Sequence, residues 1–172
     1  IFTTLELIRK RPQTKITMFE KGPLRGLGDQ DNKTCGFGGS GAFSDGKLDL
    51  THKIGGTLVE GGYLNVAEFN ELMRYVENTY MHYCPTVDTM VEIENSAEIE
   101  RIMRLCEMHE MQLIPFPVRH LGTDRAYWIV KGMYEELHSA GVDIRVETEV
   151  IRLDPQEGGF VVNWQQTEIV ID

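Results

Sequence analysis

A glycine-rich stretch holds the residues of this chain whose types and spacing are best suited to chemistry. Five glycines fall within the twelve residues Cys35–Gly46. Without Cβ atoms, successive backbone N–H groups can converge on an anionic or planar ligand. Ser40, Ser44 and Lys47 add hydroxyl and ammonium donors to the same stretch. The stretch therefore predicts a nucleotide-like ligand.

Two familiar phosphate-binding patterns occur within this stretch, and neither has its usual context. Gly36–Gly41 matches the dinucleotide fingerprint, but the preceding Asp29–Thr34 is not a strand and no clear helix follows. Gly41–Lys47 matches a phosphate loop except that Leu48 replaces the Ser or Thr that would hold magnesium. A flexible surface loop is the structural alternative, although apolar side chains are interleaved with the glycines.

A second candidate lies upstream, where the short predicted strand Lys15–Glu20 ends on a carboxylate. In a doubly wound nucleotide-binding fold, an acidic residue at the end of the second strand accepts hydrogen bonds from a ribose. Glu20 stands in that position. The alternative is a solvated glutamate at a strand end, which is common on protein surfaces.

A third candidate is the pair Arg119 and His120, just ahead of a predicted helix that Thr123 or Asp124 would cap and Gly141 would close. A helix N-terminus flanked by Arg and His can receive a carboxylate or phosphate. The alternative is that the arginine pairs locally and the histidine is a surface imidazole.

Composition limits the classes of protein to which the chain can belong. With 172 residues and 41% hydrophobic content, it can form one sizeable domain or two small lobes. The net charge of −10 disfavours nucleic acid and anionic membrane as partners. Apolar runs are too short for a transmembrane helix, so we expect a cytoplasmic protein. Three cysteines without a C-x-x-C pair predict reduced thiols and no metal site.

Periodicity predicts a mixed α/β fold in which a βα unit is followed by a three-strand antiparallel meander. A capping box at Asn95–Glu98 supports one of the helices, and two prolines make 113–117 an edge strand or extended crossover. The predicted helices cover residues 1–10, 66–82, 96–110 and 123–137, and the predicted later strands cover 142–153, 160–164 and 167–171, with a turn at 154–159.

Three segments together resemble a known family. The run Cys35–Leu50, the segment Pro117–Ala126 and the strand Val142–Val150 are similar to a poorly characterised bacterial and archaeal family of FAD-dependent dehydrogenases with a glutathione-reductase-type FAD fold. The resemblance covers nearly the whole chain. It implies part of a doubly wound FAD/NAD(P)-binding Rossmann-like domain with an antiparallel β-meander appendage.

The resemblance also implies how the chain is divided. Residues 1–65 would carry the ribose-binding strand and the flavin loop, 66–117 a helical insertion, and 118–172 the βα unit and meander. Both ends would be truncated, with the first glycine-rich strand–turn–helix missing. Because that turn normally neutralises the pyrophosphate, the 172-residue chain alone is expected to be inactive.

The family's cofactor-binding roles carry over to named positions. Glu20 resembles the ribose-binding acid, with Lys21 and Gly22 beside the adenosine, and the main chain of Val150 would meet the adenine edge. The backbone along the FAD pyrophosphate and ring system would be that of Gly38, Gly39, Ser40, Gly41, Ala42, Ser44, Asp45, Gly46 and Lys47.

On the substrate side, Arg119 would orient an anionic small molecule and His120 would act as an acid or base. Disulfide reductases of this fold carry a second cysteine where this chain has Ser40, so dithiol chemistry is not expected.

The resulting hypothesis is an FAD-dependent oxidoreductase that transfers a hydride between flavin N5 and a small molecule, with NAD(P)H as a candidate electron donor. One alternative is a non-catalytic nucleotide-binding or interaction module. A flavin monooxygenase on the same fold is another.

Overall fold

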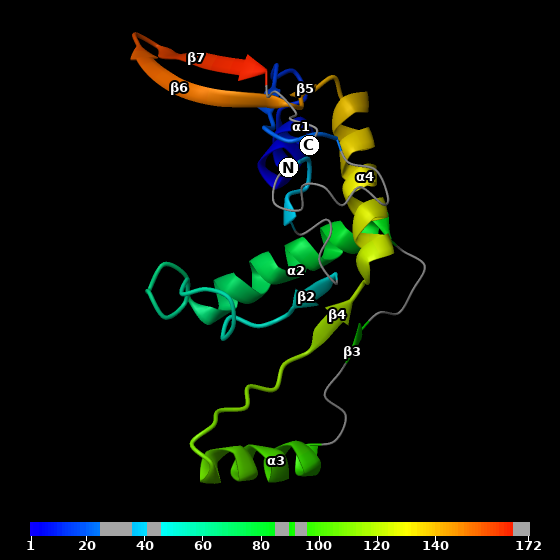
Figure 1. Cartoon of the computed structure of the whole chain (residues 1–172), viewed down its shortest axis with the longest axis vertical. Coiled ribbons are helices and arrows are strands. Elements are labelled where there is room, and N and C mark those ends of the chain that lie inside the picture. The colour runs from blue at the N-terminus through cyan, green and yellow to red at the C-terminus, as the bar shows by residue number, and fades with distance from the viewer. Residues whose placement is uncertain (25–35, 41–45, 85–89, 92–95, 167–172) are drawn as a thin grey trace, which may run out of the picture. The chain divides into compact units, whose positions relative to one another are not determined.

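The chain is a mixed α/β protein that divides into two compact units, each described here by itself (Figure 1). Unit 1 comprises residues 1–44 and 123–172, and unit 2 comprises 45–122. The computed structural model describes residues 1–24, 36–40, 46–84, 90–91 and 96–166. Within these ranges the chain forms four helices and seven strands.

Unit 1 is built on a parallel pair of short strands and two helices. Strand β1 (Thr17–Phe19) pairs with β5 (Asp143–Arg145), and Met18 lies opposite Ile144. Helix α1 (Phe2–Lys10) packs along α4 (Thr123–Ser139). The buried apolar residues of the unit lie mainly on one stripe of α4, at the spacing of a helix face. They are Leu5, Phe37, Ala126, Ile129, Met133, Leu137 and Val142.

The predicted helix after residue 122 is confirmed, and Gly141 closes it as expected. The N–H of Gly141 donates to the carbonyl of His138 at 3.0 Å, and that of Val142 donates to the carbonyl of Leu137 at 3.1 Å. These two bonds with Gly141 at φ +80° form a Schellman motif, and buried Leu137 and Val142 supply its apolar contact. The motif turns the chain directly into β5. The helix begins at Thr123, so neither predicted cap residue precedes it.

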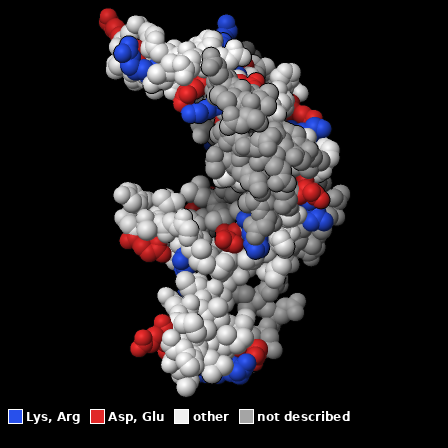
Figure 2. All heavy atoms as spheres, in the orientation of Figure 1, with Lys and Arg blue, Asp and Glu red and all other residues white. Residues whose placement is uncertain are grey.

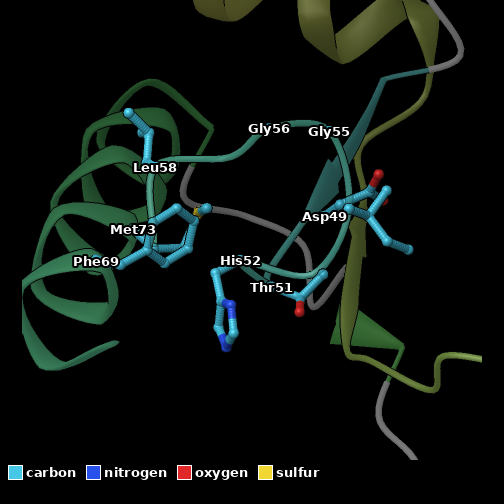
Figure 3. A pocket seen from close by; sticks show the side chains of 9 residues that line it. Asp49, Thr51, His52, Gly55, Gly56, Leu58, Phe69 and Met73 are labelled. Atoms are coloured by element: carbon cyan, nitrogen blue, oxygen red, sulfur yellow. The ribbon is translucent and has the colours of Figure 1, made fainter. Parts of the chain in front are cut away.

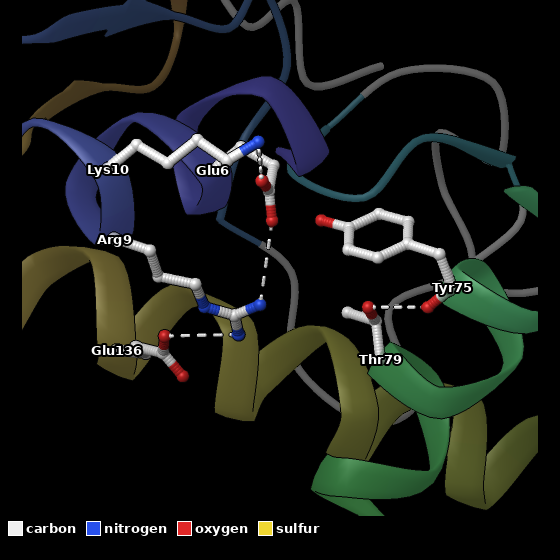
Figure 4. Close-up of polar contacts among 6 residues, drawn as sticks. All are labelled: Glu6, Arg9, Lys10, Tyr75, Thr79 and Glu136. Atoms are coloured by element: carbon white, nitrogen blue, oxygen red, sulfur yellow. Dashed lines mark hydrogen bonds and ion pairs between the residues drawn. The ribbon is translucent and has the colours of Figure 1, made fainter.

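Ion pairs connect α1 to α4 on the surface of unit 1 (Figure 4). Glu6 accepts from Lys10 Nζ at 2.9 Å and lies 3.8 Å from the Arg9 guanidinium, which reaches Glu136 at 3.5 Å. Exposed pairs of this kind contribute at most about 1 kcal/mol each. The fully buried Leu5 and Ile129 therefore matter more to the stability of the unit.

The single strand predicted over 142–153 is wrong, because the chain breaks into two strands of different sheets. Strand β5 ends at Arg145, and β6 (Thr148–Gln156) pairs with β7 (Gly159–Gln166). Glu147 adopts φ +51° at the break, where its N–H donates to Gly22 and that of Thr148 donates to Glu20. These bonds to the end of β1 fix the break, while the alternating side-chain pattern continues across it.

The turn predicted over 154–159 is also wrong in length, since both strands run further than expected. Only Glu157 and Gly158 connect β6 to β7, and Gly158 has φ +83°. One face of the hairpin is polar, where Asp154 accepts from Arg152 and Asn163. The exposed apolar side chains of the other face are Val150, Leu153, Phe160, Val162 and Trp164. The predicted third strand, 167–171, lies outside the described residues.

Unit 2 holds a small antiparallel sheet in the order β2-β4-β3 and two helices. The strands are β2 (Lys47–Asp49), β3 (Met90–Val91) and β4 (Val118–His120). The predicted helix over 66–82 is confirmed as α2 (Val66–Tyr83). Its capping box joins Asn65 and Glu68, with bonds of 3.0 and 2.8 Å.

Helix α3 (Ser96–Met108) ends two residues before the predicted Glu110 and buries none of its residues. Its predicted cap, Asn95, lies outside the described residues. Residues 111–117 form neither helix nor strand, in agreement with an extended crossover. On the face of the molecule drawn in Figure 2, Lys and Arg alternate with Asp and Glu in small groups, without a broad basic surface among the described residues.

The buried stripe of α4 makes a direct prediction for the stability of unit 1. Ile129→Ala removes a side chain that is 0% exposed, so we expect the free energy of unfolding to fall by about 3 kcal/mol. Val130→Ala, at the half-buried neighbouring position, is the control and should cost clearly less. Urea unfolding followed by circular dichroism measures both, and equal losses would contradict this core assignment.

Candidate functional site

The predicted site residues gather into two groups, one within each unit. In unit 1 the group, here called the Glu20 cluster, contains Glu20, Lys21, Gly22, Val150 and the turn 36–40. In unit 2 the group, here called the β4 cluster, contains Gly46, Lys47, Arg119 and His120. The predicted residues Gly41, Ala42, Ser44 and Asp45 lie outside the described residues.

Glu20 stands at the carboxyl end of β1, as the sequence predicts, and holds three parts of the chain together. Its Oε1 accepts from the N–H of Gly22 at 2.7 Å and from the N–H of Gly36 at 2.9 Å. Its own N–H donates to Arg145, and its carbonyl accepts from Thr148, both at 2.9 Å. The carboxylate is therefore fixed at the end of the parallel pair, beside the start and the end of segment 22–36.

Phe37 anchors the turn 36–40 to the body of unit 1. Its ring is 3% exposed and meets the Tyr134 ring of α4 edge-on, with centroids 5.3 Å apart. Its N–H donates to Pro23 at 3.1 Å, and the N–H of Gly39 closes the turn onto Gly36 at 2.8 Å. This buried edge-to-face contact holds Phe37 against α4. Ser40, at the end of the turn, is exposed.

Lys21 follows Glu20 in the chain, and Val150 lies near the start of β6 in the hairpin. The Lys21 ammonium donates to Glu149 at 2.8 Å, and Val150, 38% exposed, pairs across the hairpin with Trp164. The hydrogen bond and the charge of Lys21 lower the pKa of the Glu149 carboxyl below its ordinary value. The adenosine-side residues that the resemblance named are thus brought together in unit 1.

In unit 2, the pairing of β2 with β4 brings the end of the glycine-rich stretch beside the third candidate pair. Lys47 lies opposite His120 and Leu48 opposite Arg119, and the N–H of Leu121 donates to Gly46 at 2.7 Å. Residues more than seventy positions apart in sequence therefore share one sheet. Backbone pairing of this type is not visible from either segment alone.

The side chains of Arg119 and His120 have different environments. The Arg119 guanidinium forms an ion pair with Glu77 of α2, through Nε at 2.9 Å and through a second short contact. The two side chains are only 13% and 18% exposed. His120 is exposed. Arg119 is thus paired within the protein, although with a partner distant in sequence, and its role toward a substrate remains a prediction.

The structure shows why residue 46 is a glycine, and the sequence did not indicate this reason. A Cβ at this position would lie 2.5 Å from the carbonyl oxygen of Gly122, so the two backbones touch. Gly39 has nearly the same φ, +62° against +66°, but a Cβ there would meet nothing within 4 Å. The prediction that the glycines admit a ligand is thus compatible with Gly39, while backbone packing accounts for Gly46.

Three partners of the predicted side chains were not among the predicted site residues. Gly36 supplies an N–H to Glu20, Glu149 pairs with Lys21, and Glu77 pairs with Arg119. Gly36 belongs to the glycine-rich stretch, so the sequence could have suggested its N–H as a hydrogen-bond donor. Glu77 and Glu149 are 42 and 128 residues from their partners, and no local pattern marks them.

No protein-family model, curated protein or solved structure matches the chain. Within the described ranges, no three His, Cys, Asp or Glu side chains gather so that they could hold a metal ion. None of the helices in those ranges combines the length and apolar content needed to cross a membrane.

The contrast between Gly39 and Gly46 is testable. Alanine at either position must adopt a left-handed φ, which costs about 1–2 kcal/mol. Gly46→Ala adds a clash with the Gly122 backbone, so it should destabilise the protein by roughly 2 kcal/mol more than Gly39→Ala does. Urea unfolding midpoints of the two variants provide the comparison. Indistinguishable midpoints would show that Gly46 does not touch Gly122.

The Lys21–Glu149 pair predicts a pH dependence. Because the folded carboxyl has a lowered pKa, its stabilising interaction is present above the pKa of the unfolded group and is lost as pH falls through the folded pKa. Lys21→Met should return the pKa of Glu149 toward its ordinary value, as measured by NMR titration of the side-chain carboxyl. Lys10→Met, which removes a lysine paired with Glu6, should leave the Glu149 pKa unchanged.

Proposed function

We propose that this chain is part of an FAD-dependent oxidoreductase and that the Glu20 cluster binds the adenosine end of FAD. The observation that carries the proposal is the half-buried Glu20 carboxylate at the carboxyl end of a parallel strand pair, held by two backbone N–H groups. In doubly wound folds, ligands bind outside the carboxyl ends of the strands. The proposed domain is of that doubly wound, Rossmann-like type.

The geometry of Glu20 suits a ribose. Both backbone bonds end on Oε1, and the described residues supply no donor to Oε2. A fixed carboxylate with one oxygen available can accept a hydrogen bond from a ribose hydroxyl, and charge-assisted bonds are roughly twice as strong as neutral ones. Lys21 and the main chain of Val150 would lie beside the adenosine.

The turn 36–40 also suits a large planar cofactor. Gly39 has open space where a Cβ would be, and Phe37 fixes the turn from behind. The turn can therefore present backbone groups to a ligand without moving. When bound, FAD would supply the hydride chemistry, and this chain would supply position and electrostatics.

On the substrate side, we propose a small anionic molecule as the reductant or oxidant, with NAD(P)H as a candidate electron donor. His120 is exposed and can exchange a proton with a ligand. Arg119 could orient an anion only in competition with Glu77, because that carboxylate already occupies its guanidinium. The proposed role of His120 as an acid or base is therefore better supported than the proposed role of Arg119 in orienting an anion.

The Arg119–Glu77 pair favours one alternative, a non-catalytic nucleotide-binding module. If the arginine only joins β4 to α2, the chain would lose its proposed substrate anchor while the Glu20 cluster kept its ligand. Such a module would bind ADP as tightly as FAD, whereas a flavoenzyme would favour FAD.

Glu20 variants test the proposed function. Glu20→Gln keeps a carbonyl oxygen for Gly22 and Gly36 but removes the charge, so FAD affinity should fall at least about tenfold while stability changes little. Glu20→Ala removes both functions, so stability should fall as well. Isothermal titration with FAD, together with urea unfolding, measures the two effects.

The control for charge is Glu135→Gln, which neutralises an exposed carboxylate on α4 of the same unit. It should leave FAD affinity unchanged. If Glu20→Gln binds FAD as tightly as the unmodified chain while Glu20→Ala unfolds more readily, then Glu20 only fastens segment 22–36. That result would remove the basis of the proposal.

A further inference from the structure

We propose that unit 2 carries a binding site of its own for a small apolar amine, in the pocket between residues 49–58 and helix α2 (Figure 3). The pocket has a volume of about 190 Å³, and the described residues that line it all belong to unit 2. Pockets for drug-sized ligands typically measure about 300–1,000 Å³, so the occupant must be smaller. This inference is independent of the proposed flavin function.

The described lining combines apolar side chains, among them Ile54, with polar ones. Figure 3 shows Leu58, Phe69 and Met73 together on one side and Asp49 with Thr51 on the other. Leucine, phenylalanine and methionine side chains suit an aromatic ring or a branched aliphatic group. A ligand with an apolar body and one polar end would satisfy both sides.

The polar side favours a cation or a strong hydrogen-bond donor. Among the described residues that line the pocket, Asp49 is the one carboxylate and neither lysine nor arginine is present, while the ring of His52 is paired with Glu60. Among the described residues, no donor to the Asp49 carboxylate is present, and Thr51 Oγ1 accepts from the N–H of Lys53 at 3.2 Å. The Thr51 hydroxyl hydrogen can therefore point elsewhere. A protonated amine would pair with Asp49 and could also lie over the Phe69 ring.

The segment over the pocket is held in place before any ligand binds. Within 57–64, Gly61 donates to Thr57 at 2.7 Å, and Tyr63 and Leu64 both donate to Leu58 at 3.0 Å. His52, in the pocket-lining segment 49–58, contacts Glu60 of this turn at 3.3 Å, and the contact joins the two parts of the chain. The turn leads into the capping box of α2. Preorganisation of this kind lowers the entropic cost of binding.

A second carboxylate, Glu60, lies outside the described lining but contacts the lining residue His52. The pKa of the Glu60 carboxyl is lowered by a hydrogen bond from its own backbone and, after that, by the hydrogen bond with His52. An anionic ligand would meet the Asp49 carboxylate, with neither lysine nor arginine among the described lining residues to attract it.

Three matched probes test the inference on the full 172-residue chain. Benzylamine, benzyl alcohol and benzoate share one ring and differ in the charge of the polar end. We expect NMR titration to show benzylamine binding in the millimolar range, weaker binding of benzyl alcohol, and no binding of benzoate, with shifts at residues such as Phe69 and Met73. Benzoate binding as tightly as benzylamine, or no binding by any probe, would overturn the inference.

Two variants test separately the role of the Asp49 charge and the role of the cavity. Asp49→Asn should weaken benzylamine at least about tenfold and leave benzyl alcohol unchanged. The charge control Glu71→Gln, an exposed position on α2 outside the pocket, should change neither probe. Gly56→Leu should abolish binding of both probes, since Gly56 lines the pocket and a Cβ there has open space around it.

A urea unfolding curve for each variant shows that it is folded. If Asp49→Asn weakens both probes equally, the carboxylate does not recognise the amine and the inference fails. Unchanged benzylamine binding in a folded Gly56→Leu variant would place the ligand outside this pocket and would also overturn it.

Discussion

The organisation of unit 1 depends on the hydrogen bonds made by one residue, Glu20. One of its oxygens binds the N–H groups of Gly22 and Gly36, and its backbone connects β1 to the break between β5 and β6. The same residue therefore fixes the parallel pair, the glycine turn and the base of the hairpin. Both of these backbone N–H groups solvate a carboxylate that is half-buried. Its position is consequently suited both to holding the fold and to meeting a nucleotide.

Unit 2 depends on a different kind of constraint, because its strands are only two or three residues long. Such short strands gain little from their ladder bonds alone. The Arg119–Glu77 ion pair joins the central strand to α2, and the close approach of Gly46 to Gly122 brings the two ends of the unit together. Both features use residues that the sequence singles out for chemistry. A motif residue can thus have a structural role that accounts for its type.

The sequence predicted well those features that local patterns encode. Helix α2 and the Gly141 end of α4 follow from apolar spacing and from a glycine at a left-handed position. The placement of Glu20 at a strand end was also predicted. The break at Glu147 was missed, because alternation continues through it and long-range bonds to Glu20 and Gly22 decide it. For the same reason, the partners Glu77 and Glu149 could not be identified before the fold was known.

The central claim is that this chain contributes the adenosine-binding part of a flavoprotein. Its most direct test is a visible absorption spectrum of the longer protein of which the chain is proposed to be part, taken as purified and again after reconstitution with FAD and removal of free cofactor, with the released flavin identified by chromatography. The account predicts retained flavin bands and FAD, rather than FMN, in the released fraction. A colourless protein that has taken up no FAD would contradict the claim and would leave the Glu20 carboxylate with a structural role only.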